Sequence, residues 1–301
     1  APEAGNLIQR FVQYPGSRYT TAGQAWREVR NNWIIPYGAA LLAITVLALA
    51  IFYLSRGALG REPADGGGRR IERFTPFERA AHWCNATAFV TLALSGIVMA
   101  FGKFFLQPVL GQQLFGWLAF GLKNVHNFMG PLFAVSLAVI ILTFVKDNIA
   151  SRADFVWLSK AGGMFSNQEV PSHRFNAGEK GMFWWGITIP GVFVVLSGLV
   201  LDRLIPGWGL VRAEMQIAHM VHATLAIWMM ALLLGHIYMG TIGMRGAFKA
   251  MKTGYVSEAC ARQHHELWAD DGRSGKIPAQ RSGPARAEAA APAKSALGGT
   301  P

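Results

Sequence analysis

Charged residues are scarce in this chain. Asp, Glu, Lys and Arg make up only 15% of the 301 residues, whereas 52% are hydrophobic. Soluble domains carry roughly 25% charged residues, so the deficit excludes an ordinary soluble domain and indicates a membrane protein. Cysteine is scarcer still, because Cys84 and Cys260 are the two present and neither belongs to a C-x-x-C pair. Their spacing argues against iron–sulfur ligation and against a disulfide framework.

The sequence does contain five apolar stretches that are long enough to span a bilayer, which takes about 20 helical residues. They cover residues 33–54, 81–101, 125–145, 182–201 and 217–242. These lengths predict an all-α membrane protein with five transmembrane helices in total.

Basic residues are distributed unevenly between the connecting segments. Twenty of the 28 Lys and Arg residues lie in segments 55–80, 146–181 and 243–301, and eight lie in segments 1–32, 102–124 and 202–216. The positive-inside rule therefore predicts that the first three segments are cytoplasmic and that the N-terminus is outside. Because the basic residues mark topology, the net charge of +11 does not indicate a nucleic-acid partner.

The chain begins at Ala1 rather than at a methionine. A protein that has lost a signal peptide would begin in this way, with its new N-terminus outside the cytoplasm. A trimmed chain is the alternative explanation.

Four histidines lie in the apolar stretches: His82, His126, His222 and His236. An ionisable side chain in hydrocarbon is costly, so these positions call for a function. His222 and His236 share one stretch, and their separation corresponds to about 21 Å along a helix with the side chains about 40° apart around it. The topology places His126 with His222 near the outer face and His82 with His236 near the cytoplasmic face. Two pairs of neutral imidazoles at two depths are the ligand set for two bis-histidine haems.

Other histidines and other metals compete with this interpretation. His219 lies one turn before His222, but it is roughly 100° from His236 around the helix, so it ranks second for the outer site. Each membrane histidine could instead bond a neighbouring carbonyl. A catalytic zinc is poorly supported because there is no His-Glu-x-x-His helix. The remaining histidines outside the apolar stretches are expected to be solvated: His173, His264 and His265.

Small residues near the histidines leave room for a flat macrocycle between helices, although they would equally allow close helix packing. They are Gly96, Gly130, Ala223, Ala226 and Gly235. Pro190 lies inside the fourth stretch and predicts a kink there.

Short patterns repeat along the chain. Glu78-Arg79 and Leu-Ser-Gly at 94–96 recur as Glu179-Lys180 and Leu-Ser-Gly at 196–198, and Val-His at 125–126 recurs at 221–222. A parallel duplication of a helix pair would put His126 and His222 at equal depth, and chance matching is the alternative.

Six segments together carry the pattern of a known family. They are Arg-Phe-Thr-Pro-Phe-Glu-Arg-Ala-Ala-His-Trp (73–83), Leu-Ser-Gly-Ile (94–97), His-Asn-Phe-Met-Gly (126–130), Phe-Asn-Ala-Gly-Glu-Lys (175–180), Met-Phe-Trp (182–184) and His-Ile-Tyr-Met (236–239). With them, residues 70–270 resemble the cytochrome b (gamma) subunit of membrane-bound bacterial formate dehydrogenases. The additional N-terminal helix departs from the shortest members of that family, and the role of residues 1–60 is open.

The resemblance implies a four-helix transmembrane di-haem bundle in the bacterial inner membrane. It implies two haem b groups, one on His126 and His222 near the periplasm and one on His82 and His236 near the cytoplasm. Quinone, either menaquinone or ubiquinone, would bind beside His236 at the loop formed by Asn176, Ala177 and Gly178. The partners would be an iron–sulfur (beta) subunit and a molybdenum or tungsten catalytic (alpha) subunit. Asn176 would also serve as a helix N-cap.

These inferences divide the chain into four parts. Residues 1–60 are a periplasmic segment with an extra transmembrane helix, 61–80 a cytoplasmic linker, 81–245 the di-haem core, and 246–301 a cytoplasmic tail that is disordered from about 278. Two alternatives are a cytochrome b subunit of a nickel–iron hydrogenase or other molybdo-oxidoreductase, and a haem-free membrane anchor or transporter.

Overall fold

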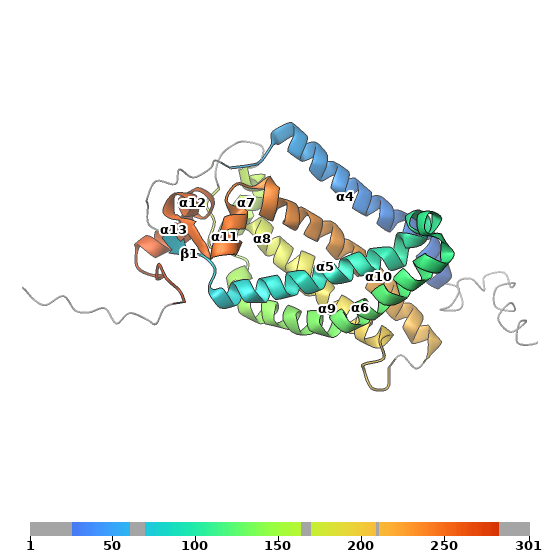
Figure 1. Ribbon diagram of the computed structural model, residues 1–301. Coiled ribbons are helices and arrows are strands. Elements are labelled where there is room, and N and C mark those ends of the chain that lie inside the picture. Colours follow the sequence, from blue (N-terminus) through green and yellow to red (C-terminus); the bar gives the residue numbers. More distant parts are fainter. Residues whose placement is uncertain (1–25, 61–69, 164–169, 209–210, 283–301) are drawn as a thin grey trace, which may run out of the picture.

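The computed structural model describes residues 26–60, 70–163, 170–208 and 211–282. Within them, five helices are long and apolar enough to cross a membrane: Trp26–Arg56, Pro76–Phe105, Gln107–Phe144, Ala177–Leu201 and Ala213–Gly243. They run alongside one another in an elongated bundle (Figure 1). The predicted all-α membrane fold with five membrane helices is confirmed.

The first helical hairpin of the core consists of α5 (Pro76–Phe105) and α6 (Gln107–Phe144). The sequence interpretation that residues 102–124 form a connecting segment is wrong, because α5 continues to Phe105 and α6 begins at Gln107, with a non-helical break at Gly111. Pro108 in the first turn of α6 favours the helical φ angle. Gly111, with φ of 76°, supplies a local bend that a side chain would disfavour.

The second hairpin begins with α8 (Ala177–Gly181), which continues through a π-helical segment, η4 (Met182–Thr188), into α9 (Ile189–Leu201). The predicted irregularity at Pro190 takes this form, since a π-helical turn accommodates a proline that lacks its N–H. The hairpin is completed by α10 (Arg212–Tyr238) and its π-helical extension η5 (Met239–Gly243).

The additional helix, α4 (Ile35–Arg56), follows η1 (Val29–Ile34) and runs along one side of the bundle (Figure 1). It approaches α10 closely at Gly38, where a Cβ atom would lie 2.6 Å from Ile227 Cδ1. Only 11% of its most apolar window is buried within the chain. Most of the α4 surface is therefore available to lipid.

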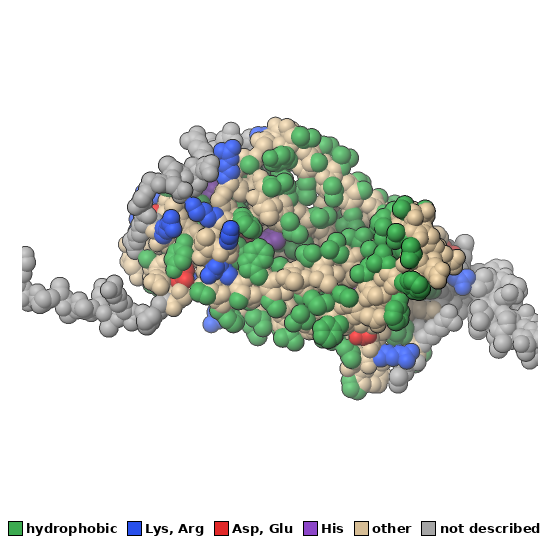
Figure 2. All heavy atoms as spheres, in the orientation of Figure 1, with side chains coloured by type: hydrophobic (Ala, Val, Ile, Leu, Met, Phe, Trp, Pro, Cys, Tyr) green, Lys and Arg blue, Asp and Glu red, His purple; other side chains and the backbone are tan. Residues whose placement is uncertain are grey.

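Short elements gather at one end of the bundle, which we call the cap. They are β1 (Arg70–Glu72), η2 (Lys146–Asn148), α7 (Arg152–Ser159), η3 (Ala161–Gly163), α11 (Ala247–Thr253), β2 (Tyr255–Ser257), α12 (Glu258–His264) and α13 (Glu266–Arg273). Strands β1 and β2 are antiparallel, with Ile71 opposite Val256. Figure 2 shows Lys and Arg side chains gathered on this end and hydrophobic side chains along the bundle.

The chain after the fifth membrane helix is folded over much of its length. Trp268 and Ala269 on α13 are 4% and 0% exposed. The backbone N–H groups of Arg281 and Ser282 donate to the Glu72 carboxylate at 2.5 and 2.6 Å. The structure therefore gives defined contacts to residues just beyond 278, where disorder was expected, and residues 283–301 lie outside the described part.

The two core hairpins start in the same way. Thr75 accepts a hydrogen bond from the Glu78 N–H while Glu78 accepts one from the Thr75 N–H. Asn176 and Glu179 form the same reciprocal capping box at the start of α8. The repeat seen in the sequence thus extends to matching helix starts, and each cap contributes about 1 kcal/mol to helix stability.

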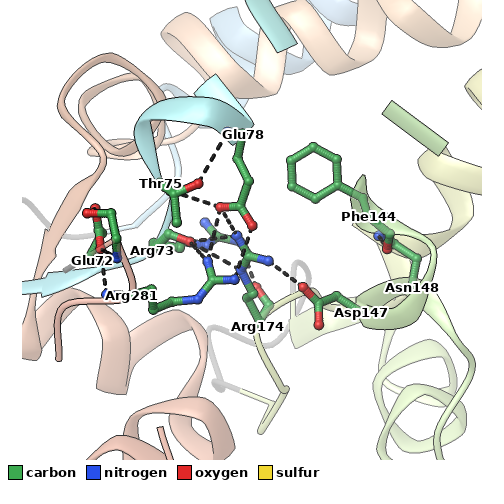
Figure 3. Close-up of polar contacts among 10 residues, drawn as sticks. Glu72, Arg73, Thr75, Glu78, Phe144, Asp147, Asn148, Arg174 and Arg281 are labelled. Carbon is green, nitrogen blue, oxygen red and sulfur yellow. Dashed lines mark hydrogen bonds and ion pairs between the residues drawn. The ribbon is translucent and has the colours of Figure 1, made fainter. Parts of the chain in front are cut away.

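Arginines that precede these two caps form ion pairs with the opposite hairpin. Arg73 pairs with Glu179 at 2.8 Å, and Arg174 pairs with Glu78 at 2.7 Å. Each arginine also donates to the carbonyl of the other, at 2.9 and 2.7 Å. Figure 3 shows Arg174 between Glu78 on α5 and Asp147 after α6. The two hairpins are therefore locked together by a reciprocal arrangement.

His265 lies beside this arrangement, and the expectation that it is solvated is wrong. Its side chain is buried, and its Nδ1–H donates to the His173 carbonyl at 2.9 Å. Burial, followed by the positive charge of Arg73, lowers the pKa of His265 to about 3, against the smaller opposing effect of Glu179. His265 therefore stays neutral in the folded protein across the physiological range.

The pH dependence of stability should reveal this buried histidine. Below pH 6.5 His265 is protonated in the unfolded chain but stays neutral in the folded protein. The free energy of unfolding therefore decreases as pH falls from 6.5 toward about 3. His265→Asn retains an amide donor for the His173 carbonyl and cannot titrate in this window. We expect thermal unfolding in detergent to show a smaller drop between pH 7 and pH 4.5 for this variant than for the unaltered protein. His173→Asn, at an exposed position, is the control, and equal drops for all three proteins would contradict the assignment.

Candidate functional site

His126 and His222 face each other between α6 and α10. Their ring centroids are 6.1 Å apart, with the ring planes at 66°. A metal–imidazole bond is roughly 2 Å long and a ring nitrogen lies about 1.2 Å from its ring centre, so imidazoles on opposite sides of one metal ion have centroids roughly 6.4 Å apart. The separation of these two rings therefore fits one metal ion bound between them.

His82 and His236 form a second pair, between α5 and α10. Their ring centroids are 6.2 Å apart, with the ring planes at 57°. The structure thus brings together the same two couples that the depth argument predicts, and α10 carries one member of each. The His82–His236 pair lies on the side of the cap, because His82 is in the second turn of α5.

The two pairs lack the further ligands of an ordinary metal site. Within the described ranges, no group of three or more His, Cys, Asp or Glu side chains is arranged to hold a metal ion. Structural zinc normally takes four protein ligands. Two opposed imidazoles suit a metal whose other ligands come from a macrocycle, as in bis-histidine haem.

Glycines supply the space that such a group needs. A Cβ atom at Gly198 would lie 3.1 Å from His222 Cε1, and one at Gly96 would lie 3.7 Å from His126 Cε1. Each imidazole of this pair therefore packs against a glycine on the neighbouring helix. A Cβ atom at Gly130 or Gly235 would meet open space, which fits the predicted room beside the histidines.

Serines next to those glycines contact the same two imidazoles. Ser95 Oγ lies 2.8 Å from His126 Nδ1. Ser197 Oγ lies 3.3 Å from His222 Nδ1, which also lies 2.9 Å from the Val194 carbonyl. Sequence reasoning missed both serines as site residues, although the repeated Leu-Ser-Gly pattern was the available signal.

His219 is directed elsewhere. Its Nδ1 accepts a hydrogen bond from the Trp26 indole N–H at 3.2 Å, and the two ring centroids are 5.9 Å apart. This contact ties the start of the additional helix to α10. His222, rather than His219, is thus the residue of α10 whose ring faces His126.

The predicted loop of Asn176, Ala177 and Gly178 is instead the start of α8, because Asn176 is the N-cap and the helix begins at Ala177. It lies at the same end of the bundle as the His82–His236 pair. Asn176 is half-buried and caps α8 through its side-chain oxygen, as the N-cap interpretation predicts. Ala177 is buried and Gly178 is exposed. A Cβ atom at Gly178 would lie 3.0 Å from the Trp157 ring, so this tryptophan of α7 covers one side of the start of α8. No pattern in the sequence pointed to Trp157.

The family model of prokaryotic cytochrome b561 matches residues 73–254. The chain belongs to this family. It is 28% identical over 202 residues to the formate dehydrogenase cytochrome b556(fdo) subunit of Escherichia coli K12, a match that covers 66% of this chain and 91% of the relative. It is 30% identical over 206 residues to the nitrate-inducible formate dehydrogenase cytochrome b556(Fdn) subunit of the same strain, covering 66% of this chain and 90% of that relative. A Haemophilus influenzae formate dehydrogenase cytochrome b556 subunit is 23% identical over 203 residues, covering 66% and 82%.

These matches confirm the resemblance inferred from the motifs. Membership of a cytochrome b family implies haem b. The two imidazole couples fit this group, because their separations, their glycine neighbours and the absence of further ligands among the described residues all suit it. The match begins at residue 73, so the additional helix α4 lies outside it.

The two glycines allow a matched test of the packing against the His126 and His222 imidazoles. Gly198→Ala places a methyl group 3.1 Å from His222, so we expect it to displace the ring, lower the haem content and cost about 1–3 kcal/mol of stability. Gly96→Ala creates only an ordinary contact with His126 at 3.7 Å and should retain haem. Absorbance of haem per mole of purified protein, together with the thermal unfolding midpoint, measures both effects. Equal haem content in the two variants would contradict the close packing at Gly198.

Proposed function

We propose that this protein is the di-haem cytochrome b subunit of a formate dehydrogenase, and that it transfers electrons from a periplasmic iron–sulfur subunit to quinone near the cytoplasmic face. The observation that carries the proposal is the pair of opposed imidazole couples, with centroids 6.1 and 6.2 Å apart, at two depths of one membrane bundle. In this assignment His126 with His222 and His82 with His236 would each hold one haem b, which would supply one-electron transfer.

The relatives support formate as the source of electrons. Those described above are named as formate dehydrogenase subunits, and the match covers 82–91% of their length. The described residues contain no grouped metal ligands of their own. We therefore assign formate oxidation to a catalytic partner subunit and electron delivery to an iron–sulfur partner.

The chain itself supplies a route through the bilayer. Helix α10 carries His222 and His236, so one rigid element fixes the distance between the two haem sites. His126 on α6 and His82 on α5 complete the couples from the other hairpin. Between the two histidines α10 carries buried apolar residues, Met229 and Leu233 among them, and the proposed route runs from the His126–His222 end toward the cap.

The cap supports the proposed orientation. Figure 2 shows Lys and Arg side chains gathered on the cap, on the face that it draws. Basic residues concentrate on the cytoplasmic side of membrane proteins. We therefore place the cap in the cytoplasm and the His126–His222 end toward the periplasm of a bacterial inner membrane.

The proposed quinone site is the start of α8, formed by Asn176, Ala177 and Gly178, on the His236 side of the bundle. Glu179 follows Gly178 in α8, and its carboxylate accepts from the Asn176 N–H in the capping box. The Asn176 side-chain oxygen is used in the capping box, which leaves its amide N–H groups as donors for a quinone carbonyl. Trp157 beside Gly178 offers an aromatic surface at the same place.

Quinone reduction takes two electrons and two protons, and the cap offers a route for the protons. A cavity of about 420 Å³ opens next to the start of α8, and Asp147, His173 and Lys180 are among its lining residues. Its polar lining would admit water from the cytoplasmic side. Proton uptake there, with electrons arriving from the other face, would contribute to the proton-motive force.

Double substitutions test which histidines share a haem. His126→Ala and His222→Ala should each lose one haem of two, and the double variant should lose no more than either alone. His82→Ala combined with His222→Ala should lose both, because those residues belong to different couples. The readout is the reduced-minus-oxidised absorbance per mole of protein. Loss of both haems in the His126→Ala, His222→Ala variant, with folded protein by circular dichroism, would contradict the pairing.

The amide of Asn176 can be separated from its capping role. Asn176→Ser keeps an oxygen that caps α8 but removes the amide donor, so we expect the KM for quinone to rise roughly 3–10-fold, as for one lost hydrogen bond of about 0.5–1.5 kcal/mol, with haem content unchanged. Thr75→Ser, at the equivalent cap of α5, is the matched control and should leave quinone kinetics unaltered. Unchanged quinone kinetics in the Asn176 variant would remove the start of α8 from the site.

A further inference from the structure

The same arrangement holds both imidazoles of the His126–His222 pair. Ser95 and Gly96 on α5 contact His126, and Ser197 and Gly198 on α9 contact His222. The carbonyl three residues before Ser197 takes part as well, since the Val194 carbonyl lies 2.9 Å from His222 Nδ1. Two helices that are far apart in the sequence thus present the same groups to two ligands of one couple.

The serine hydrogen bonds decide which imidazole nitrogen carries the proton. A hydroxyl has one hydrogen to donate. Ser95 Oγ donates to the Thr91 carbonyl at 2.8 Å, and Ser197 Oγ donates to the Phe193 carbonyl at 2.6 Å. The Val194 carbonyl can only accept, so His222 donates from Nδ1–H. With the Ser95 hydrogen directed at the Thr91 carbonyl, Ser95 Oγ is the acceptor for Nδ1–H of His126 in the same way. Nε2 is left without its hydrogen in both rings and is free to bind a metal.

The His82–His236 pair is supported differently. His82 Nδ1 is buried and has no hydrogen-bond partner among the residues that the structure describes. A ligand imidazole that donates Nδ1–H to an acceptor is more basic than one that does not. A more basic ligand stabilises ferric iron, so second-shell hydrogen bonds of this kind lower the reduction potential of a haem.

We propose that Ser95 and Ser197 are positioning residues that fix the Nδ1–H form of His126 and His222 and lower the reduction potential of their haem below that of the His82–His236 haem. This inference rests on the proposed function, since it presumes haem on both couples. It gives electron transfer a favourable direction, from the His126–His222 end toward the cap. The hydroxyls act through the imidazoles and touch neither iron nor substrate.

The two serines should differ in how strongly each affects the midpoint potential of the haem. His126 has Ser95 Oγ at 2.8 Å, whereas Ser197 Oγ is 3.3 Å from His222, which retains the Val194 carbonyl at 2.9 Å. Ser95→Ala should therefore raise the midpoint potential of the His126–His222 haem more than Ser197→Ala does. The double variant should raise it furthest, and Ser95→Thr, which keeps a hydroxyl, should restore the original value.

Redox titration followed by absorbance provides the test, with both haems counted first in the unaltered protein. His82→Ala, which retains the haem of the other couple, assigns the lower potential. Ser136→Ala is the matched control, because Ser136 is a buried membrane serine that bonds Asn85 and its own helix but no histidine. It can lower thermal stability but should move neither potential.

The outcomes separate the two proposals. Absence of haem from the unaltered protein would overturn the proposed function itself. Two haems with potentials that stay fixed in the double serine variant would overturn only the role of the serines. A shift confined to the His82–His236 haem, or a shift equally large in the Ser136 control, would also overturn it.

Discussion

A polar side-chain group that lies in hydrocarbon is costly without a partner, and this cost shapes the His126–His222 end of the core. An imidazole has two nitrogens to satisfy. In the His126–His222 couple, neighbouring serines and carbonyls take Nδ1 of each ring, and the other nitrogens can meet at one metal between the rings. The same rule applies to Asn85, whose amide donates to Ser136 Oγ at 2.9 Å. Because a wrongly placed polar group would be costly, helix positions and ring orientations are fixed together.

An approximate two-fold relation between the hairpins explains why one couple is symmetric and the other is not. Arg73 and Arg174 each pair with a glutamate of the other hairpin, and Phe74 and Phe175 lie with ring centroids 6.1 Å apart. His126 and His222 occupy equivalent helices, α6 and α10, and receive the same Ser-Gly support. His82 and His236 lie on non-equivalent helices, α5 and α10. The π-helical segment η4 lengthens the second hairpin, so the spacing between matching residues changes by one along it. A duplicated unit could therefore give two haem sites with different surroundings and different potentials.

Sequence reasoning reached the features that depend on length and on hydropathy. Five apolar stretches predicted five membrane helices, and the 14-residue spacing on α10 predicted two imidazoles on one face. The connection at 102–124 was placed wrongly because Lys103 and Lys123 marked it as a loop, although the residues between them are apolar enough to remain helical. The repeated Leu-Ser-Gly pattern was a signal for Ser95 and Ser197, but their histidine partners could not be predicted from it, because each hydrogen bond joins two helices whose rotation depends on tertiary packing. The burial of His265 was missed for a similar reason, since short cap elements are fixed by contacts with distant segments such as β1.

The central claim is that two imidazole couples each hold one haem b. Electron paramagnetic resonance of the oxidised, purified protein tests it most directly, because a ferric haem with two histidine ligands is low-spin and each distinct site gives its own signal. The account predicts two low-spin signals in equal amounts, each integrating to one spin per protein. A single signal, a high-spin signal as the main species, or no haem signal would contradict it.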